Sequence, residues 1–153
     1  MSVGLMTKHR LLFPALLSVF VTGCAQTVSM FPTAGPLKNQ TPLPVLQAKA
    51  DNITSNSGKF SVTYPNGDKC VGRWSSVAPQ MTSVSWGSLF SQYGAISGVA
   101  TSVSNLPGIN RGEAVAVCGS GNQLTVEFYT GSGTANGLGV AKDEQGNIFK
   151  LIF

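Results

Sequence analysis

The sequence is poor in charged side chains, which make up 10% of its 153 residues. Lys and Arg exceed Asp and Glu by only four formal charges, and the basic residues are dispersed along the chain. Nucleic-acid binding requires a concentrated basic surface, so we expect no nucleic-acid partner. The 18 Gly residues, together with many Ser, Thr and Asn, favour an all-β chain with many turns over a helical one.

Long hydrophobic runs are also absent. The longest such segment, Leu11 to Val21, has eleven residues and is interrupted only by Pro14 and Ser18. A transmembrane helix needs about 20 apolar residues. A shorter run preceded by the basic residues Lys8 and Arg10 is typical of a secretory signal peptide. The sequence therefore predicts a signal peptide over residues 1–23 and no transmembrane anchor.

The end of this run, Val21-Thr22-Gly23-Cys24, resembles the lipobox of bacterial lipoproteins, which has an aliphatic residue, two small residues and an obligatory Cys. The resemblance implies cleavage between Gly23 and Cys24 and a covalent lipid on Cys24, which would hold the protein on a membrane. Ala25 replaces the Asp that typically retains such lipoproteins in the inner membrane. The resemblance thus implies the periplasmic face of the bacterial outer membrane. The alternative is an ordinary cleaved secretory signal, with Cys24 free or in a disulfide.

Histidine is almost missing, since His9 is the only one and it lies within the predicted signal peptide. A mature chain without imidazole lacks Ser-His-Asp and Cys-His catalysis and His-ligated zinc. Cleavage would also remove Lys8 and Arg10, which lowers the formal net charge from +4 to +2. We predict no metal site, and no cofactor apart from the covalent lipid.

Only three Cys residues occur. If Cys24 carries lipid, Cys70 and Cys118 remain as an even pair in an oxidising compartment, and this favours a disulfide between them. The alternative is two buried, reduced thiols.

Residues 24–57 hold four of the eight prolines among Thr, Ser, Asn and Gln, and their apolar residues show no clear period. This composition predicts a flexible tether, locally extended by proline. The alternative is that Leu43 to Leu46 packs on the domain as an additional edge segment. We place the folded domain at residues 58–153.

Three hairpins are predicted in that domain. Alternating apolar and polar residues flank turn sequences rich in Gly, Asn and Asp in each case. The predicted hairpins cover residues 58–75, 111–130 and 137–153. We therefore expect an all-β domain, a small antiparallel sheet or barrel of about six strands, in which the apolar last strand lies centrally.

The first hairpin resembles a single MORN repeat. The matching residues are Tyr64, Gly67-Asp68, Gly72 and Trp74, while Cys70 stands where the repeat usually has Tyr. A MORN array needs several tandem copies because one hairpin cannot bury its own apolar face. The chain has no tandem array, so the resemblance implies shared hairpin geometry and no MORN function.

Residues 85–96 do not fit the strand pattern. Trp86, Leu89, Phe90 and Tyr93 fall at helical spacing, which predicts a short helix or an ordered loop that covers the core or binds a ligand. Trp86, Tyr93 and Tyr129 are the candidate binding residues, because exposed aromatic rings stack on sugar rings or peptide side chains.

The expected function is a non-enzymatic binding or structural role in the cell envelope, with an envelope protein or cell-wall glycan as partner. One alternative is a periplasmic enzyme inhibitor, because lysozyme-inhibitor lipoproteins are also small disulfide-bearing β-barrels; this is an analogy of fold alone. Another is a carboxylate-based enzyme, for which Glu113 and Glu127 could pair across neighbouring strands as in a glycosidase. Exposed glutamates on a sheet surface are the simpler interpretation.

Overall fold

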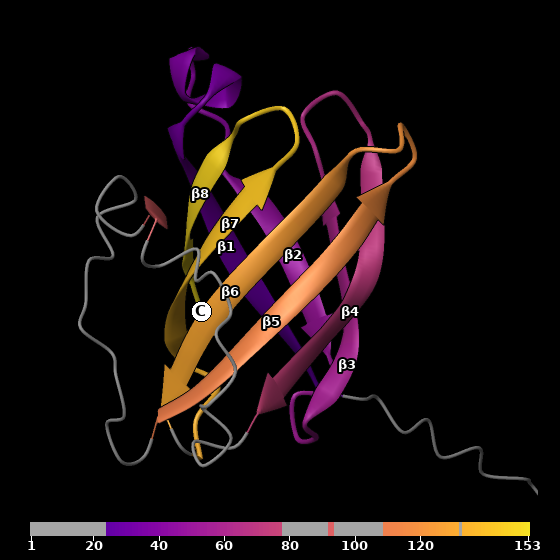
Figure 1. The fold of residues 1–153 in the computed structure, drawn as a ribbon, viewed down its shortest axis with the longest axis vertical. Helices are drawn as coiled ribbons and strands as arrows, with labels where there is room; N and C mark the ends of the chain where they lie inside the picture. Colours follow the sequence, from indigo (N-terminus) through magenta and orange to yellow (C-terminus); the bar gives the residue numbers. More distant parts are fainter. Residues whose placement is uncertain (1–23, 78–91, 94–108, 132) are drawn as a thin grey trace, which may run out of the picture.

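The computed structural model describes residues 24–77, 92–93, 109–131 and 133–153. Each strand in this part of the chain pairs antiparallel with the next, and the last pairs with the first, so that the sheet closes into a barrel (Figure 1). The described elements are β1 (Ala25–Ala34), the 3-10 helix η1 (Pro36–Asn39), β2 (Leu46–Asp51), β3 (Ser57–Thr63), β4 (Lys69–Val77), β5 (Ile109–Cys118), β6 (Gln123–Gly131), β7 (Gly137–Asp143) and β8 (Ile148–Ile152).

The all-β class and the three predicted hairpins are confirmed. They correspond to β3–β4, β5–β6 and β7–β8. In the first hairpin the predicted apolar face is the one that points into the barrel, and its members are all buried: Phe60, Val62, Tyr64, Cys70 and Trp74. The apolar strand β8 has partners on both sides, β7 and β1, so it has no free edge.

The predicted tether over residues 24–57 is wrong, and the domain begins at Ala25. Two further strands, β1 and β2, come from this segment and raise the count from six to eight. The alternation is present in β2, where Leu46, Ala48 and Ala50 are buried, but Ala is a weak indicator of a strand. Pro32 is one of the four prolines on which the tether prediction rested, and the structure accommodates it at a register shift in the β1–β8 ladder.

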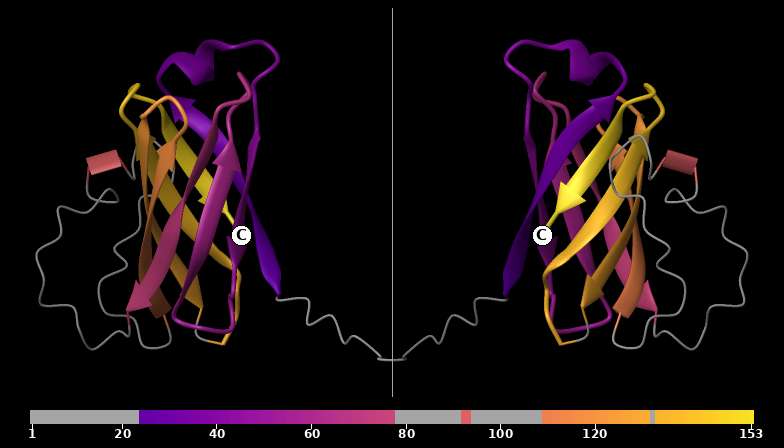
Figure 2. Two further views of the ribbon diagram at one scale, coloured as in Figure 1. Left: turned by 90° about the vertical axis from the view of Figure 1, so that its right-hand side faces the viewer. Right: turned by 90° about the vertical axis from the view of Figure 1, so that its left-hand side faces the viewer.

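The two ends of the barrel differ. Cys24 and the start of β1 lie at one end, which we call the Cys24 end, and η1 lies at the other, which we call the η1 end (Figure 2). All described strands, the closing β1–β8 pair and the buried core lie between Ala25 and Phe153. The chain from Ala25 onward therefore contains a complete barrel.

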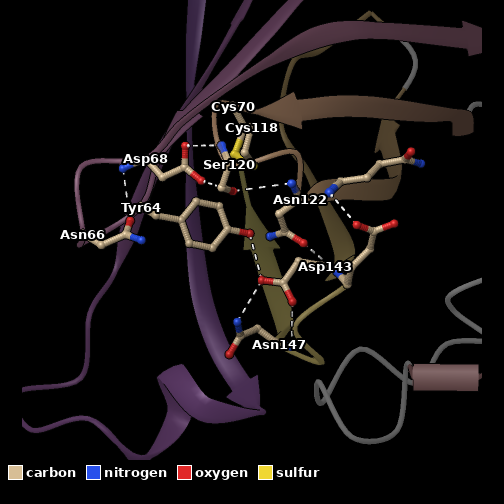
Figure 3. Close-up of a disulfide and its surroundings, with 11 residues drawn as sticks. Tyr64, Asn66, Asp68, Cys70, Cys118, Ser120, Asn122, Asp143 and Asn147 are labelled. Atoms are coloured by element: carbon tan, nitrogen blue, oxygen red, sulfur yellow. Dashed lines mark hydrogen bonds between the residues drawn. A yellow bond between two sulfur atoms is a disulfide. The ribbon is translucent and has the colours of Figure 1, made fainter.

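The predicted disulfide is confirmed. Cys70 of β4 and Cys118 of β5 are direct partners in the strand register, and their sulfurs are bonded (Figure 3). The bridge lies at the η1 end, where β4 begins and β5 ends.

Removing this disulfide should destabilise the barrel. In the chain-entropy model, a bridge between residues 48 positions apart restricts the unfolded chain by about 4 kcal/mol. We expect the double variant Cys70→Ser/Cys118→Ser to lose about 3–4 kcal/mol in free energy of unfolding, measured by urea denaturation of the mature chain. The exposed Cys24 supplies the control, since Cys24→Ser should leave stability unchanged. Equal stability of the double variant and its parent would contradict the expectation.

Of the predicted helix or loop at residues 85–96, only Gln92 and Tyr93 are described, and both are helical. Trp86 lies outside the described residues. Among the described residues, no helix has the length and hydrophobicity needed to cross a membrane.

Candidate functional site

A cavity of about 520 Å³ opens at the Cys24 end of the barrel. Its mouth is bordered by the start of β1 at Gln26, the β2–β3 turn at residues 53–56 and the loop residues 133–135. Cavities that bind small molecules typically have volumes of roughly 300–1,000 Å³. An eight-stranded barrel has room inside for its own side chains or for one small ligand. The size and position of this cavity therefore suit one small molecule.

Among the described residues, four aromatic side chains line the cavity: Phe60, Trp74, Phe128 and Phe153. The Trp74 indole donates a hydrogen bond of 2.8 Å from Nε1 to the backbone oxygen of Asp51, which fixes the ring. The Phe128 ring lies edge-on to Trp74, with 6.3 Å between centroids, and 5.6 Å from the Phe153 ring. These contacts hold the aromatic wall in one arrangement.

Glycine makes room for two of these rings. A Cβ atom on Gly58 would collide with the Trp74 indole, and one on Gly112 would collide with the Phe128 ring. Each ring therefore lies against a neighbouring strand at a position where a side chain larger than glycine would collide with it. Ala50 and Ala114 also line the cavity, and their small side chains leave part of the barrel interior unfilled.

The polar part of the lining is uncharged. Ser, Thr, Asn and Gln side chains surround the mouth, and within the described part of the chain no Asp, Glu, Lys or Arg lines the cavity. A buried charge needs a partner to offset its lost hydration. The cavity is therefore suited to an uncharged, apolar ligand or to the apolar part of an amphiphile.

The η1 end is closed by a hydrogen-bond network (Figure 3). The buried Asp143 carboxylate accepts from the Tyr64 hydroxyl at 3.0 Å, and from the backbone and side-chain nitrogens of Asn147 at 2.8 Å each. The Asn147 amide oxygen accepts from the Leu37 backbone N–H of η1 at 2.8 Å. Among the described residues no buried side-chain polar atom lacks a partner. This network joins the β3–β4 turn, η1 and the β7–β8 turn and closes the η1 end, whereas the aromatic cavity opens at the Cys24 end.

Burial, followed by the nearby charge of Asp143, raises the pKa of Tyr64 well above its ordinary value. An unfolded tyrosine loses its proton near pH 10, whereas folded Tyr64 keeps it. Its contribution to stability is therefore present below about pH 10 and is lost as the pH rises above that value, by about 1.4 kcal/mol per pH unit.

The variant Tyr64→Phe tests this dependence. At pH 8 it should be less stable than the parent by about 1–3 kcal/mol, because the buried Asp143 carboxylate loses a donor. Above pH 10 the difference should shrink, since phenylalanine does not titrate. Urea unfolding of the parent and of Tyr64→Phe at pH 8 and pH 11 measures this difference in free energy of unfolding. A difference that does not change with pH would contradict the raised pKa of Tyr64.

The two glutamates predicted as a pair are adjacent, but they do not line the cavity. Glu113 and Glu127 are direct partners across β5 and β6 and point to the outer face of the barrel. Glu113 is exposed, whereas the buried Glu127 forms an ion pair of 2.8 Å with Arg111 and accepts a hydrogen bond of 3.3 Å from Tyr129. The ion pair gives Glu127 a structural role.

The two described tyrosines predicted to bind a ligand also lie on the outer face. Tyr93 packs against Val140 and Ile148, and its hydroxyl accepts a hydrogen bond of 2.7 Å from Lys142 Nζ. Tyr129 is half-buried beside Glu127. The aromatic residues that line the cavity fall instead within the three predicted hairpins. The feature of the sequence that could have indicated a cavity beside these rings is the set of small residues next to them: Gly58, Gly112, Ala50 and Ala114.

Metal-binding geometry is not found in the described ranges, where no three His, Cys, Asp or Glu residues form a group that could hold an ion. Comparison with protein-family models gives no match. Curated proteins and solved structures give no significant match either. The cavity and the Cys24 motif are therefore the features from which a function can be inferred.

Proposed function

We propose that this chain is a non-enzymatic envelope lipoprotein, anchored through Cys24 to the periplasmic face of the outer membrane, whose barrel binds one small apolar ligand. The observation that carries the proposal is the aromatic cavity of about 520 Å³, open at one end of the barrel. Cys24 is exposed and outside the disulfide, so its sulfur is accessible for the modification that the lipobox-like sequence implies.

The chemistry of the lining supports binding over catalysis. The deep wall consists of aromatic and aliphatic side chains, and the mouth offers uncharged hydrogen-bonding groups. Such a site gives affinity through burial of apolar surface and orients the ligand through a few polar contacts. An apolar wall of this kind favours a hydrophobic ligand over cell-wall glycan as the molecule bound in the cavity.

A fluorescent probe tests the proposal. The mature chain with Cys24→Ser, which is a complete barrel without lipid, is titrated with the uncharged dye N-phenyl-1-naphthylamine. We expect saturable binding of one dye per chain, with energy transfer from Trp74 in the cavity wall. In a Trp86→Phe background, which leaves Trp74 as the remaining tryptophan, the variant Trp74→Phe keeps an aromatic wall and should lose this transfer. A dye signal that rises linearly without saturation would contradict the proposal.

A further inference from the structure

We propose that the cavity takes a single acyl chain at the surface of the membrane to which the protein is anchored. This inference rests on the proposed function, because it identifies the ligand of the same cavity. Three observations carry it: the position of the mouth relative to Cys24, the polarity of the lining, and the absence of the predicted tether.

The mouth of the cavity is held close to the attachment point. Gln26 lines the mouth, and only Ala25 separates it from Cys24. Two residues of extended chain span at most about 7 Å, which is comparable to the thickness of one lipid headgroup layer, roughly 5–8 Å. A lipid on Cys24 would therefore hold this end of the barrel at the membrane interface.

Because β1 begins directly after Cys24, no flexible segment separates the attachment point from the barrel. A flexible tether of some 30 residues would have placed the domain about 30 Å from the membrane on average, but the barrel begins at Ala25. In Figure 2 the start of β1 lies at the same end as the β2–β3 turn, which borders the mouth. The cavity thus opens toward the surface on which its ligand would be most concentrated.

The lining suits an amphiphile that enters by its tail. The deeper wall includes Val126 and Leu151, which are almost fully buried, and the mouth carries Ser55, Asn56 and Asn110. An acyl chain would contact the wall, while its ester or hydroxyl group would meet the uncharged polar groups at the mouth. The charged headgroup would stay in the interface, where water solvates it.

An acyl chain can reach the mouth from two sources, a membrane glycerolipid or the lipid on Cys24 itself. Both present the same chemistry to the cavity.

Chain-length dependence separates this inference from the proposed function. Monoacylglycerols with six to ten carbons per chain compete with N-phenyl-1-naphthylamine for the mature Cys24→Ser chain, below their micelle concentrations. Each added methylene should tighten binding about fourfold until the cavity is full. If the dye binds but competition does not depend on chain length, the acyl inference fails and the proposed function stands. If the dye does not bind, both fail.

Photocrosslinking in intact cells identifies the source. A photoreactive leucine replaces Leu151 in the cavity of the full chain, or Val117, which is exposed on β5 near the η1 end. We expect an acyl adduct at position 151 and none at 117. A glycerophospholipid adduct would assign the membrane as the source, and a link to the Cys24 peptide would assign the protein's own lipid. No acyl adduct at position 151, or equal yields at both positions, would overturn the inference.

Discussion

Replacing Ala114 with Trp should weaken ligand binding by about 100-fold or more. Ala114 is buried on β5, opposite Trp74 of β4 and Val126 of β6 in the register, and all three line the cavity. An indole at this position would fill part of the cavity in which the ligand is proposed to bind. Each methylene excluded from the wall costs about 0.8 kcal/mol, so the loss of three or four accounts for a 100-fold effect.

The adjacent residue provides a matched control. Val115 is exposed on the outer face of the same strand, so Val115→Trp adds the same side chain outside the barrel and should leave binding unchanged. Titration with N-phenyl-1-naphthylamine measures both variants, and circular dichroism establishes that each is folded. Overpacking typically costs about 1–3 kcal/mol, so the Ala114→Trp barrel should remain folded. A folded Ala114→Trp chain that binds as tightly as the parent would contradict the assignment of the site.

The second large effect concerns Cys24. The variant Cys24→Ser should incorporate no labelled palmitate in cells, and its leader, residues 1–23, should remain uncleaved, because the implied processing requires the modified thiol. The control is Cys70→Ser/Cys118→Ser, which removes the other two Cys residues and should still be labelled. Electrophoresis with autoradiography measures both properties. Labelling that persists in Cys24→Ser, or a parent chain without label, would contradict lipid attachment at Cys24.

Local patterns in the sequence were sufficient for six of the eight strands. Phe60, Val62 and Tyr64 alternate with polar residues next to a clear turn, and this pattern gives both the strand and its buried face. In β2 the alternating buried residues include Ala48 and Ala50, whose small side chains give little signal. The strands β1 and β2 are stabilised by pairing with β8 and β3, respectively, in the closed barrel. A short segment of sequence contains no information about these pairings.

The cavity could not be predicted for a related reason. Alternation shows which side chains of a strand point inward, but not at which height along the barrel they lie. That height depends on the register of every strand pair: Trp74 meets Phe128 only because β4, β5 and β6 are aligned as they are. The closed end depends in the same way on a contact between Tyr64 and Asp143, which are 79 residues apart.

The most direct test of the central claim is native mass spectrometry of the mature Cys24→Ser chain, which carries no lipid of its own, after incubation with glycerophospholipid vesicles and transfer into mild detergent. We predict one additional bound molecule per parent chain, with the mass of a lipid that carries an acyl chain, and its loss in Ala114→Trp but not in Val115→Trp. A parent chain that carries no bound lipid, or equal amounts on the parent and Ala114→Trp, would contradict the claim that the open end of this barrel is a binding site for an acyl chain.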